Sequence, residues 1–280
     1  MRLQVIGDPV LHSKSPVLHG AMLSALGLDA AYDARVVRRG ELPDYLRWAR
    51  DHGVAGFNAT MPHKEDLLPL LDGMDPAARL TGAVNTVCLR EGAWVGFNTD
   101  GAGALSALGE VLGFDPAGST VTLLGAGGAA KAVALALAQA GAERVRVCNR
   151  TLKRAGELCA RHPRLTPAPF DPDTLERLCR GADLLVNCTS LGMEGCPRPV
   201  EGFSFLDALP PHGAVFDLIY HPAETELLAQ ARRRGLRTMN GLPMLVWQAV
   251  LALEHFLNRP LDRGAMAAAA SAALEHKQLF

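Results

Sequence analysis

The sequence predicts an α/β protein with two domains, each built on a sheet covered by helices. Strand-like and helix-like segments alternate along the chain, which is typical of parallel or mostly parallel sheets. A break at residues 113–118 contains glycine and proline, and a new strand pattern starts after it at 120–124. The length of 280 residues suffices for two domains of about 100 to 200 residues each.

Before the break, the pattern predicts strands, helices and one hairpin. In chain order they are a strand at 3–7, a helix at 16–26, a strand at 31–37, a helix at 43–52, a strand at 54–58, a hairpin at 84–98 and a helix at 101–112. The hairpin is indicated because apolar and polar residues alternate on both sides of Glu91-Gly92.

After the break, the pattern predicts a doubly wound sheet. The expected segments are a strand at 120–124, a helix at 128–140, a strand at 144–148, a helix at 153–161, and strands at 183–187 and 214–218. Gly235 and Gly241 bracket one more short strand, and the alanine-rich stretch 265–273 is a good helix former. The apolar helix expected at 244–257 has no strand after it, so periodicity leaves it open to either domain.

Composition and charge limit the classes of partner. Hydrophobic residues make up 49% and charged residues 20%, which is typical of a chain that buries a proper core. A net charge of -1 provides no basic field for nucleic acid phosphates or anionic lipid. We therefore expect a small-molecule partner, with neither nucleic acid nor a membrane, and the sequence leaves monomer and homodimer open.

No targeting, membrane-spanning or metal-binding pattern is found in the sequence. Lys131 interrupts the most apolar stretch, which falls short of the roughly 18 residues of a membrane span. Residues 1–7 form a strand pattern rather than a signal peptide, so we expect a cytoplasmic chain. The cysteines include no Cys-x-x-Cys pair, which favours reduced, scattered side chains and no metal site. They are Cys88, Cys148, Cys159, Cys179, Cys188 and Cys196.

A glycine-rich loop indicates dinucleotide binding. It fits G-x-G-x-x-G/A and reads Gly125-Ala126-Gly127-Gly128-Ala129-Ala130. The loop follows a predicted strand and opens a predicted helix, which is the context that distinguishes it from a plain glycine-rich turn. The first glycine makes a tight turn, the second lets the backbone approach a pyrophosphate, and Ala130 allows close packing. Amides at the helix start then point at the phosphates.

The end of the next strand favours NADP over NAD. An NAD site usually offers an acid to the ribose about 20 residues beyond the glycines. Here the sequence reads Asn149-Arg150-Thr151-Leu152-Lys153-Arg154, which contains no acid. Arg150 and Arg154 can bind a 2′-phosphate, and Thr151 adds a hydroxyl. The alternative is a solvated helix start, although cations there oppose the helix dipole.

Lysine is rare in this chain, with five against 23 arginines (28 Lys+Arg minus five Lys). A lysine ammonium can be tuned to give up a proton near neutral pH, whereas arginine stays charged. Four of the five lie in or beside short polar motifs: Lys14, Lys64, Lys131 and Lys153. The rarity of lysine makes each of these four residues a candidate proton carrier, but it does not show which of them has that role.

Polar groups follow the predicted strands of the first domain. They are Ser13 with Ser15, Thr60 with Lys64, Asn85 with Thr86, and Asn98-Thr99-Asp100-Gly101. Ligands of open α/β sheets bind beyond the carboxyl ends of strands, so these groups are expected to share one crevice. Each also has a structural alternative: either serine as a helix cap, Asn85 in a turn, and Asp100 as the cap of the next helix.

Together these motifs resemble the shikimate/quinate dehydrogenase family, in order over nearly the whole chain. They are Ser13-Lys14-Ser15-Pro16, residues 58–64, Gly82-Ala83-Val84-Asn85-Thr86, Asn98-Thr99-Asp100-Gly101, the Gly125 loop, Asn149-Arg150-Thr151, and Gly241-Leu242-Pro243-Met244-Leu245 with Gln248. The resemblance implies reduction of 3-dehydroshikimate to shikimate by NADPH, a step in aromatic amino acid biosynthesis (the chorismate pathway). It also implies a substrate domain of residues 1–103 plus 241–280 and a Rossmann-like NADP domain of residues 104–240.

The resemblance also implies roles for individual residues. Lys64 and Asp100 match the catalytic pair. Substrate binding is implied for Ser13, Ser15, Thr60, Asn85, Tyr220 and Gln248. Cofactor binding is implied for Gly125, Ala126, Gly127, Gly128, Ala129, Asn149, Arg150, Thr151, Arg154, Leu218 and Gly241.

The residue types fit this chemistry. A ketone that accepts hydride becomes an alkoxide, and a lysine can both stabilise that charge and deliver a proton. Asp100 would orient Lys64, and the two would titrate as a coupled pair. No metal is needed for such a step. His63 beside Lys64 suggests a relay, but chain neighbours usually point apart, so a structural role is favoured.

Two other functions stay open at this point. A quinate-preferring or dual-specificity relative is one, because Ala59, His63 and Trp247 depart from the family pattern. Ser15, where quinate-directed relatives tend to have threonine, favours shikimate. The other is a non-catalytic NADP-binding sensor on the same fold, which would be expected to have lost Lys64 or Asp100.

Overall fold

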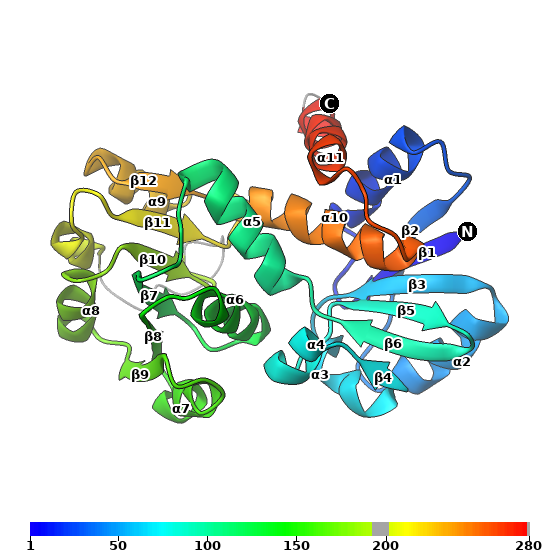
Figure 1. The fold of residues 1–280 in the computed structure, drawn as a ribbon, viewed down its shortest axis with the longest axis horizontal. Coiled ribbons are helices and arrows are strands. Elements are labelled where there is room, and N and C mark those ends of the chain that lie inside the picture. Colours follow the sequence, from blue (N-terminus) through cyan, green and yellow to red (C-terminus); the bar gives the residue numbers. More distant parts are fainter. Residues whose placement is uncertain (192–201, 279–280) are drawn as a thin grey trace. The chain divides into compact units, whose positions relative to one another are not determined.

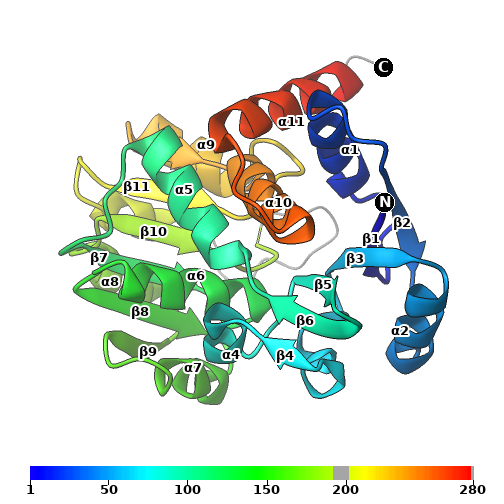
Figure 2. The same ribbon diagram turned by 45° about the vertical axis from the view of Figure 1, so that its right-hand side comes forward.

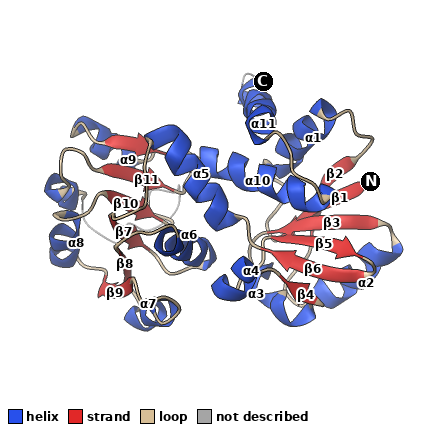
Figure 3. Ribbon diagram, in the orientation of Figure 1, coloured by secondary structure: helices blue, strands red, loops and turns tan. Residues whose placement is uncertain are grey.

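The structure is a computed structural model that describes residues 1–191 and 202–278 (Figure 1). The chain divides into two compact units. Unit 1 comprises Met1–Gly103 and Val246–Phe280, and unit 2 comprises Ala104–Leu245. The expected α/β class with two domains is confirmed, and each unit contains one six-stranded sheet (Figure 3).

The sheet of unit 1 is mixed, in the order β2-β1-β3-β5-β6-β4. Its strands are β1 (Arg2–Gly7), β2 (Ala31–Val36), β3 (Val54–Ala59), β4 (Gly73–Met74), β5 (Thr86–Arg90) and β6 (Ala93–Phe97). β1 lies parallel to both β2 and β3, whereas β5 runs antiparallel to β3 and to β6. The central strands β1 and β3 are almost entirely buried, as expected of strands with neighbours on both sides.

The predicted hairpin is confirmed as β5 and β6. Its register pairs Arg90 with Ala93 and Thr86 with Phe97. Glu91 and Gly92 both have positive φ, 50° and 85°, which is the geometry of a two-residue hairpin turn. Because the hairpin reverses the chain, the start of β5 and the end of β6 lie at the same edge of the sheet as the end of β3.

Short helices connect these strands, and a long helix completes the unit. They are α1 (Ser15–Ala25), α2 (Leu42–Asp51), α3 (His63–Asp66), the 3-10 turn η1 (Leu68–Leu70), α4 (Pro76–Thr81) and α11 (Arg263–Gln278). Asp75 caps α4 by accepting from the Ala78 amide at 2.7 Å, and Gly82 ends it in the left-handed conformation. In unit 1, α1 packs along α11 (Figure 2).

Two helices pass from one unit to the other along the chain. They are α5 (Asp100–Leu112) and α10 (Leu242–Leu257). The first residues of α5 belong to unit 1, and so does α10 from Val246 onward. The chain therefore supplies Asp100 and Gln248 to unit 1 from two distant segments of the sequence.

Unit 2 has a parallel sheet in the order β12-β11-β10-β7-β8-β9. The strands are β7 (Thr120–Leu124), β8 (Arg144–Asn149), β9 (Leu165–Pro169), β10 (Leu184–Asn187), β11 (Ala214–Asp217) and β12 (Arg237–Met239). The chain moves outward from β7 to β9 and then returns to place β10 on the other side of β7. The boundary between β7 and β10 is therefore the topological switch point, where open α/β sheets bind ligands.

In the described part of unit 2, this sheet is accompanied by four helices and one 3-10 turn: α6 (Gly128–Gln139), α7 (Leu152–Cys159), α8 (Pro172–Cys179), η2 (Ser204–Ala208) and α9 (Glu226–Arg233). Leu175 and Leu178 of α8 and Leu227 of α9 share one core cluster with Leu185 of β10 and Val215 of β11. α8 and α9 therefore cover the same side of the sheet. The doubly wound expectation for this half is confirmed.

Several elements had not been expected from the sequence, namely α3, α4, β4, β9, α8 and α9. α8 carried a readable signal, because Asp171 accepts from the Thr174 amide at 2.8 Å and Pro172 follows it. β9 contains two prolines, which is tolerated because it is an edge strand.

The five described cysteines carry free thiols, whereas Cys196 lies outside the described residues. Within the part of the chain that is described, no helix has the length and apolar character needed to cross a bilayer.

Candidate active site

Polar segments of unit 1 converge at one edge of its sheet. The ends of β1, β3 and β6 and the start of the antiparallel β5 lie there. Thr60 directly follows β3, Asn85 directly precedes β5, and Asp100 comes soon after β6. The sheet topology thus brings together residues that are far apart in the sequence, as expected for ligand sites of open sheets.

Lys64 and Asp100 form an ion pair at this edge. The Lys64 Nζ atom lies 2.6 Å from Asp100 Oδ2, and the two side chains are 22% and 8% exposed. The backbone of Lys64 is held in turn, because its carbonyl accepts from the Val84 amide at 2.7 Å. A partly buried ion pair of this kind holds the ammonium in one direction.

Asn85 fixes the other oxygen of Asp100. Its Nδ2 donates to Asp100 Oδ1 at 2.7 Å and to Thr99 Oγ1 at 2.9 Å. Its Oδ1 accepts from the Thr99 amide at 2.9 Å and from Thr86 Oγ1 at 3.0 Å. Asn85 is therefore part of a buried network rather than a simple turn residue. Both Asp100 oxygens have side-chain partners, so the carboxylate acts on Lys64 and Asn85 rather than as a helix cap.

Gln248 joins the same cluster from α10. Thr99 Oγ1 donates to the Gln248 carbonyl at 3.0 Å, and Asn85 Nδ2 lies 3.5 Å from Gln248 Oε1. The approach depends on Gly103, because a Cβ atom there would lie 2.7 Å from the Gln248 amide nitrogen. A glycine on α5 thus lets α10 bring Gln248 up to Asn85.

The two serines lie at the start of α1. Ser13 Oγ accepts from the Ser15 amide at 3.2 Å, and Ser15 is 8% exposed as the first residue of the helix. Lys14 occupies the N-cap position without a side-chain cap bond, so neither serine is the helix N-cap. Thr60 lies close to the end of β1, because a Cβ on Gly7 would meet Thr60 Cγ2 at 2.4 Å.

His63 has a structural role, as favoured from the sequence. It is fully buried, and its Nε2 lies 2.7 Å from the Val37 carbonyl. Because a carbonyl only accepts, Nε2 carries the proton and donates it. The ring is therefore committed to the backbone of the loop after β2.

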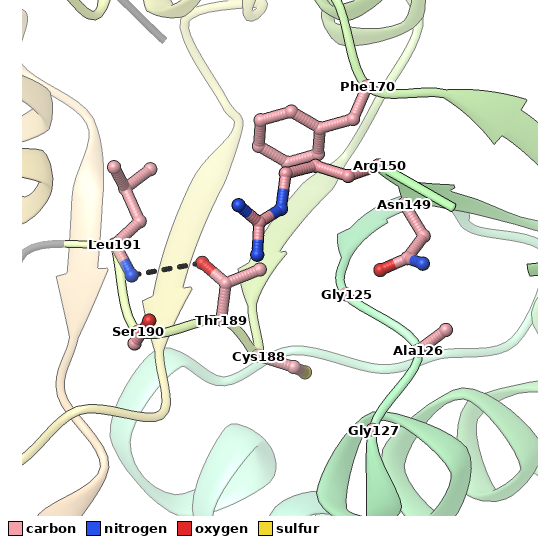
Figure 4. A pocket seen from close by; sticks show the side chains of 10 residues that line it. All are labelled: Gly125, Ala126, Gly127, Asn149, Arg150, Phe170, Cys188, Thr189, Ser190 and Leu191. Atoms are coloured by element: carbon pink, nitrogen blue, oxygen red, sulfur yellow. Dashed lines mark hydrogen bonds between the residues drawn. The ribbon is translucent and has the colours of Figure 1, made fainter. Parts of the chain in front are cut away.

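Unit 2 contains a pocket at the carboxyl ends of its central strands (Figure 4). It lies at the switch point between β7 and β10, where ligand binding is expected. The residues that line it are Gly125, Ala126, Gly127, Asn149, Arg150, Phe170, Cys188, Thr189, Ser190 and Leu191. In the close-up, the Arg150 guanidinium points across the pocket toward Thr189.

The glycine loop of this pocket fits a dinucleotide phosphate. Gly125 has φ +107°, and a Cβ there would lie 3.1 Å from the Cys188 carbonyl, so only glycine makes this turn without strain. Nothing lies within 4 Å of the position that a Cβ on Gly127 would take, which leaves room for a ligand to approach the backbone. Ala130 is 1% exposed against the sheet, as its close-packing role requires. α6 begins at Gly128, so its free amides face the loop.

The other residues implied for cofactor binding lie around this pocket or elsewhere in unit 2. Asn149 lines the pocket, and its Nδ2 donates to the Thr151 carbonyl at 2.9 Å, which shapes the start of α7. Arg154 is exposed in the first turn of α7. Leu218 and Gly241 are in direct contact, since a Cβ on Gly241 would lie 1.9 Å from the Leu218 carbonyl oxygen. Ala129 is in the first turn of α6.

Tyr220, implied for substrate binding, belongs to unit 2 and lies shortly after β11. Its side chain is partly exposed, and burial of the remainder raises its pKa. A neutral phenol is therefore maintained at this position over the physiological range.

Thr99, one of the polar residues expected at the crevice of unit 1, connects Asn85 to Gln248. Two residues that line the pocket of unit 2, Thr189 and Ser190, were not predicted from the sequence. A signal for them was present, because polar residues follow the predicted strand 183–187 just as they follow the strands of unit 1. Among the side chains that the structure describes, in residues 1–191 and 202–275, no three from His, Cys, Asp or Glu gather as a metal site would need.

Comparisons with protein families match most of the chain. A model described as the shikimate dehydrogenase substrate binding domain matches residues 5–87. A shikimate/quinate 5-dehydrogenase model matches residues 110–193, and a shikimate 5′-dehydrogenase C-terminal domain model matches residues 241–270.

Individual relatives are similar over nearly their whole length. A curated protein of Geobacter sulfurreducens named shikimate dehydrogenase (NADP(+)) is 46% identical over 279 residues, with 97% of this chain and 96% of the relative covered. The crystal structure of Thermus thermophilus shikimate 5-dehydrogenase in complex with NADP(H) and shikimate is 41% identical, with a TM-score of 0.83 and coverage of 98% and 99%. Quinate dehydrogenase of Corynebacterium glutamicum in complex with NAD is 32% identical, with a TM-score of 0.85 and coverage of 97% and 99%.

Proposed function

The chain belongs to the shikimate dehydrogenase family, and we propose that it interconverts 3-dehydroshikimate and shikimate with NADPH as the reductant. In this role the protein is an NADP-dependent oxidoreductase of aromatic amino acid biosynthesis. The observation that carries the proposal is the Lys64 and Asp100 ion pair, because it supplies the proton donor that ketone reduction requires.

We assign the two units different ligands. Unit 1 would bind the substrate, since the family model that matches residues 5–87 is described as substrate binding. Unit 2 would bind NADPH in the pocket at its switch point, which fits a dinucleotide in its glycine loop and its arginine. When bound, NADPH supplies a hydride to the substrate carbonyl carbon.

The chain's own residues would hold the substrate and move one proton. The hydroxyls of Ser13 and Ser15 would donate to the substrate carboxylate, while Thr60, Asn85 and Gln248 would bind its ring oxygens. The Lys64 ammonium would donate a hydrogen bond to the carbonyl oxygen and pass its proton to that oxygen as hydride reaches the carbon. In the reverse direction, the neutral amine would take the proton from the shikimate hydroxyl.

Asp100 would act in two ways. Its Oδ2 holds the Lys64 ammonium at 2.6 Å, and its Oδ1 is fixed by Asn85 at 2.7 Å. The carboxylate therefore cannot rotate without losing one of the two bonds, so Lys64 is held in a single orientation before substrate arrives. The carboxylate would also accept a hydrogen bond from a substrate hydroxyl.

The two alternative functions are less well supported. A non-catalytic sensor has no need of the Lys64 and Asp100 pair, which is assembled and partly buried here. A quinate preference is not favoured, because the curated relatives are named as shikimate dehydrogenases that use NADP.

A direct assay tests the proposal. Purified protein should oxidise shikimate with NADP at a much higher kcat/KM than it oxidises quinate, and NAD should replace NADP poorly. Faster oxidation of quinate than of shikimate, or no NADP-dependent turnover with either, would contradict it.

A further inference from the structure

Asp217 is a fully buried carboxylate at the end of β11, with no assigned role in catalysis or binding. It is 0% exposed. Its Oδ1 accepts from Asn187 Nδ2 at 2.9 Å and from the Ile219 amide at 3.1 Å, and its Oδ2 accepts from Thr225 Oγ1 at 2.7 Å. One side chain thus connects the end of β10, the chain after β11 and the N-cap of α9.

Asn187 carries this connection into the turn that follows β10. Its Nδ2 donates both to Asp217 Oδ1 and to the Leu191 carbonyl, the latter at 3.2 Å. Its Oδ1 accepts from the Thr189 amide at 3.0 Å and from Thr189 Oγ1 at 2.6 Å. Because the side-chain amide forms hydrogen bonds through both its nitrogen and its oxygen, the Asp217 carboxylate fixes the orientation of the amide. The oriented amide then holds residues 187–191 in their turn conformation.

The turn 187–191 forms a wall of the cofactor pocket. Thr189, Ser190 and Leu191 line that pocket together with Arg150 (Figure 4). The turn also touches the glycine loop, since a Cβ on Gly125 would lie 3.2 Å from Thr189 Cγ2. A shift of the turn by a few tenths of an ångström would therefore change the shape of the pocket directly.

Asp217 also holds the segment that contains Leu218, a residue implied to contact the cofactor. Its bond to the Ile219 amide fixes the chain after β11. The Ile219 carbonyl accepts from the Gly241 amide at 3.0 Å, and Leu218 lies against Gly241. Two separate parts of the proposed NADPH site therefore depend on the same carboxylate.

Burying a carboxylate costs free energy because the charge loses its hydration, and packing alone does not require a charged group at this position. Burial raises its pKa to about 6, and three donors offset the cost of removing the charge from water. A neutral side chain would pack here without that cost, but it would not accept three hydrogen bonds.

We propose that Asp217 is a positioning residue that sets NADPH affinity by fixing the turn 187–191 and the Leu218-Ile219 segment in their binding geometry. This inference rests on the proposed function, because NADPH is the ligand whose affinity it concerns. Asp217 acts through Asn187 and Ile219, and touches neither substrate nor cofactor.

The test compares Asp217→Ala, Asn187→Ala and Asp217→Asn with the unmodified enzyme. Dissociation constants for NADPH and for shikimate are measured separately by fluorescence titration and calorimetry, and Tm is recorded for each variant. Asp183→Ala is the matched control. Asp183 accepts from the Thr120 amide at 2.8 Å, but it precedes β10 at the opposite end of the strands from the pocket.

Asp217→Ala and Asn187→Ala should each weaken NADPH binding about tenfold or more, since tenfold corresponds to the loss of one or two good hydrogen bonds. Shikimate affinity should change less than about twofold. Asp217→Asn retains an acceptor for Asn187 and should recover most of the affinity. Asp183→Ala should lower Tm without changing NADPH binding.

Unchanged NADPH affinity in Asn187→Ala would overturn the inference. This variant removes the hydrogen bond between residues 187 and 217 but keeps the Asp217 carboxylate, so it tests the inference even if Asp217→Ala does not fold. The inference is equally overturned if Asp183→Ala weakens NADPH binding as much as Asp217→Ala does, because the effect would then follow stability alone. Failure of the unmodified enzyme to bind NADPH would instead contradict the proposed function.

Discussion

The Nζ atom of Lys64 lies 2.6 Å from Oδ2 of Asp100, across 36 residues of sequence. An ammonium has three N–H donors, and this bond uses one of them. The carboxylate is itself fixed by Asn85, so the pair has one arrangement in the described structure. The geometry is that of a positioned acid held by an orienting base, which is the general pattern of proton-transfer sites.

Replacing Asn85 with Ala should impair turnover as well as substrate binding. The change removes the donor to Asp100 Oδ1 and the bonds between Asn85 and Thr99, while Thr99 Oγ1 keeps its bond to the Gln248 carbonyl. Loss of such a buried bond costs about 1–3 kcal/mol, so kcat/KM for shikimate should fall roughly 5- to 150-fold. Steady-state kinetics at saturating NADP would measure this. A value within about twofold of the unmodified enzyme would show that Asn85 does not hold Asp100 in the working enzyme.

Replacing Gly103 with Ala should weaken shikimate binding selectively. The new methyl would lie 2.7 Å from the Gln248 amide nitrogen and would push Gln248 away from Asn85. We expect KM for shikimate to rise about fivefold or more, while KM for NADP is unchanged.

Gly109→Ala is the matched control for this change, because Gly109 is in the same helix and nothing lies within 4 Å of its added Cβ. It should leave both KM values unchanged and stabilise the helix by up to about 1 kcal/mol. Equal effects of the two substitutions on KM would show that the contact with Gln248 is not what matters.

Replacing Arg150 with Ala should reduce the preference for NADP over NAD. Arg150 lines the pocket beside the glycine loop, and its guanidinium is suited to a 2′-phosphate. We expect kcat/KM with NADP to fall about tenfold or more, since a charge-assisted bond is worth roughly 1.5–3 kcal/mol, while the value with NAD changes little. Arg154→Ala should have a smaller effect in the same direction.

Arg180→Ala is a suitable control for the arginine variants, because Arg180 is exposed in the same unit and forms an ion pair with Glu176. It should alter neither cofactor preference nor turnover. A loss of activity with NAD as large as that with NADP in Arg150→Ala would mean that Arg150 does not discriminate between them.

Acid should destabilise the protein partly through His19. Its ring is fully buried and stacked on Tyr32 at 4.2 Å, and burial lowers its pKa from 6.5 to about 3. The unfolded chain therefore takes up a proton on His19 below pH 6.5, whereas the folded chain does not. The contribution of neutral His19 to the free energy of unfolding is fully present above pH 6.5 and is lost as the pH falls toward 3.

His19→Phe keeps a ring on Tyr32 and removes the titrating group. Between about pH 7 and about pH 5, the unmodified protein should lose roughly 2 kcal/mol more free energy of unfolding than this variant. Urea denaturation at the two pH values measures the difference. Equal losses in both proteins would show that His19 is not protonated on unfolding in this range.

Local patterns were sufficient to predict much of the fold. Alternation on both sides of Glu91-Gly92 predicted the hairpin, and the glycine loop between strand and helix predicted the pocket of unit 2. α8 was not predicted, although Asp171 and Pro172 at its start are a typical N-cap and first helical residue.

The sequence predicted that polar groups gather in one crevice of the first domain, but it did not predict the individual long-range pairs outside that expectation. Asp217 meets Asn187 across 30 residues, and Thr99 meets Gln248 across 149 residues. No spacing rule predicts such pairs, because they depend on which strands are neighbours in the sheet. The same holds for Gly103, whose importance is visible only when α10 lies against it.

The central claim is that Lys64 transfers the proton, and substitution of this residue tests it most directly. NADP-dependent oxidation of shikimate is measured across pH for the unmodified enzyme, Lys64→Ala and Lys64→Arg, with NADPH and shikimate affinities measured alongside. Arginine keeps the charge but cannot release a proton near neutral pH, so both variants should lose about 100- to 10,000-fold in kcat while still binding NADPH. Near-normal turnover by Lys64→Arg would contradict the account.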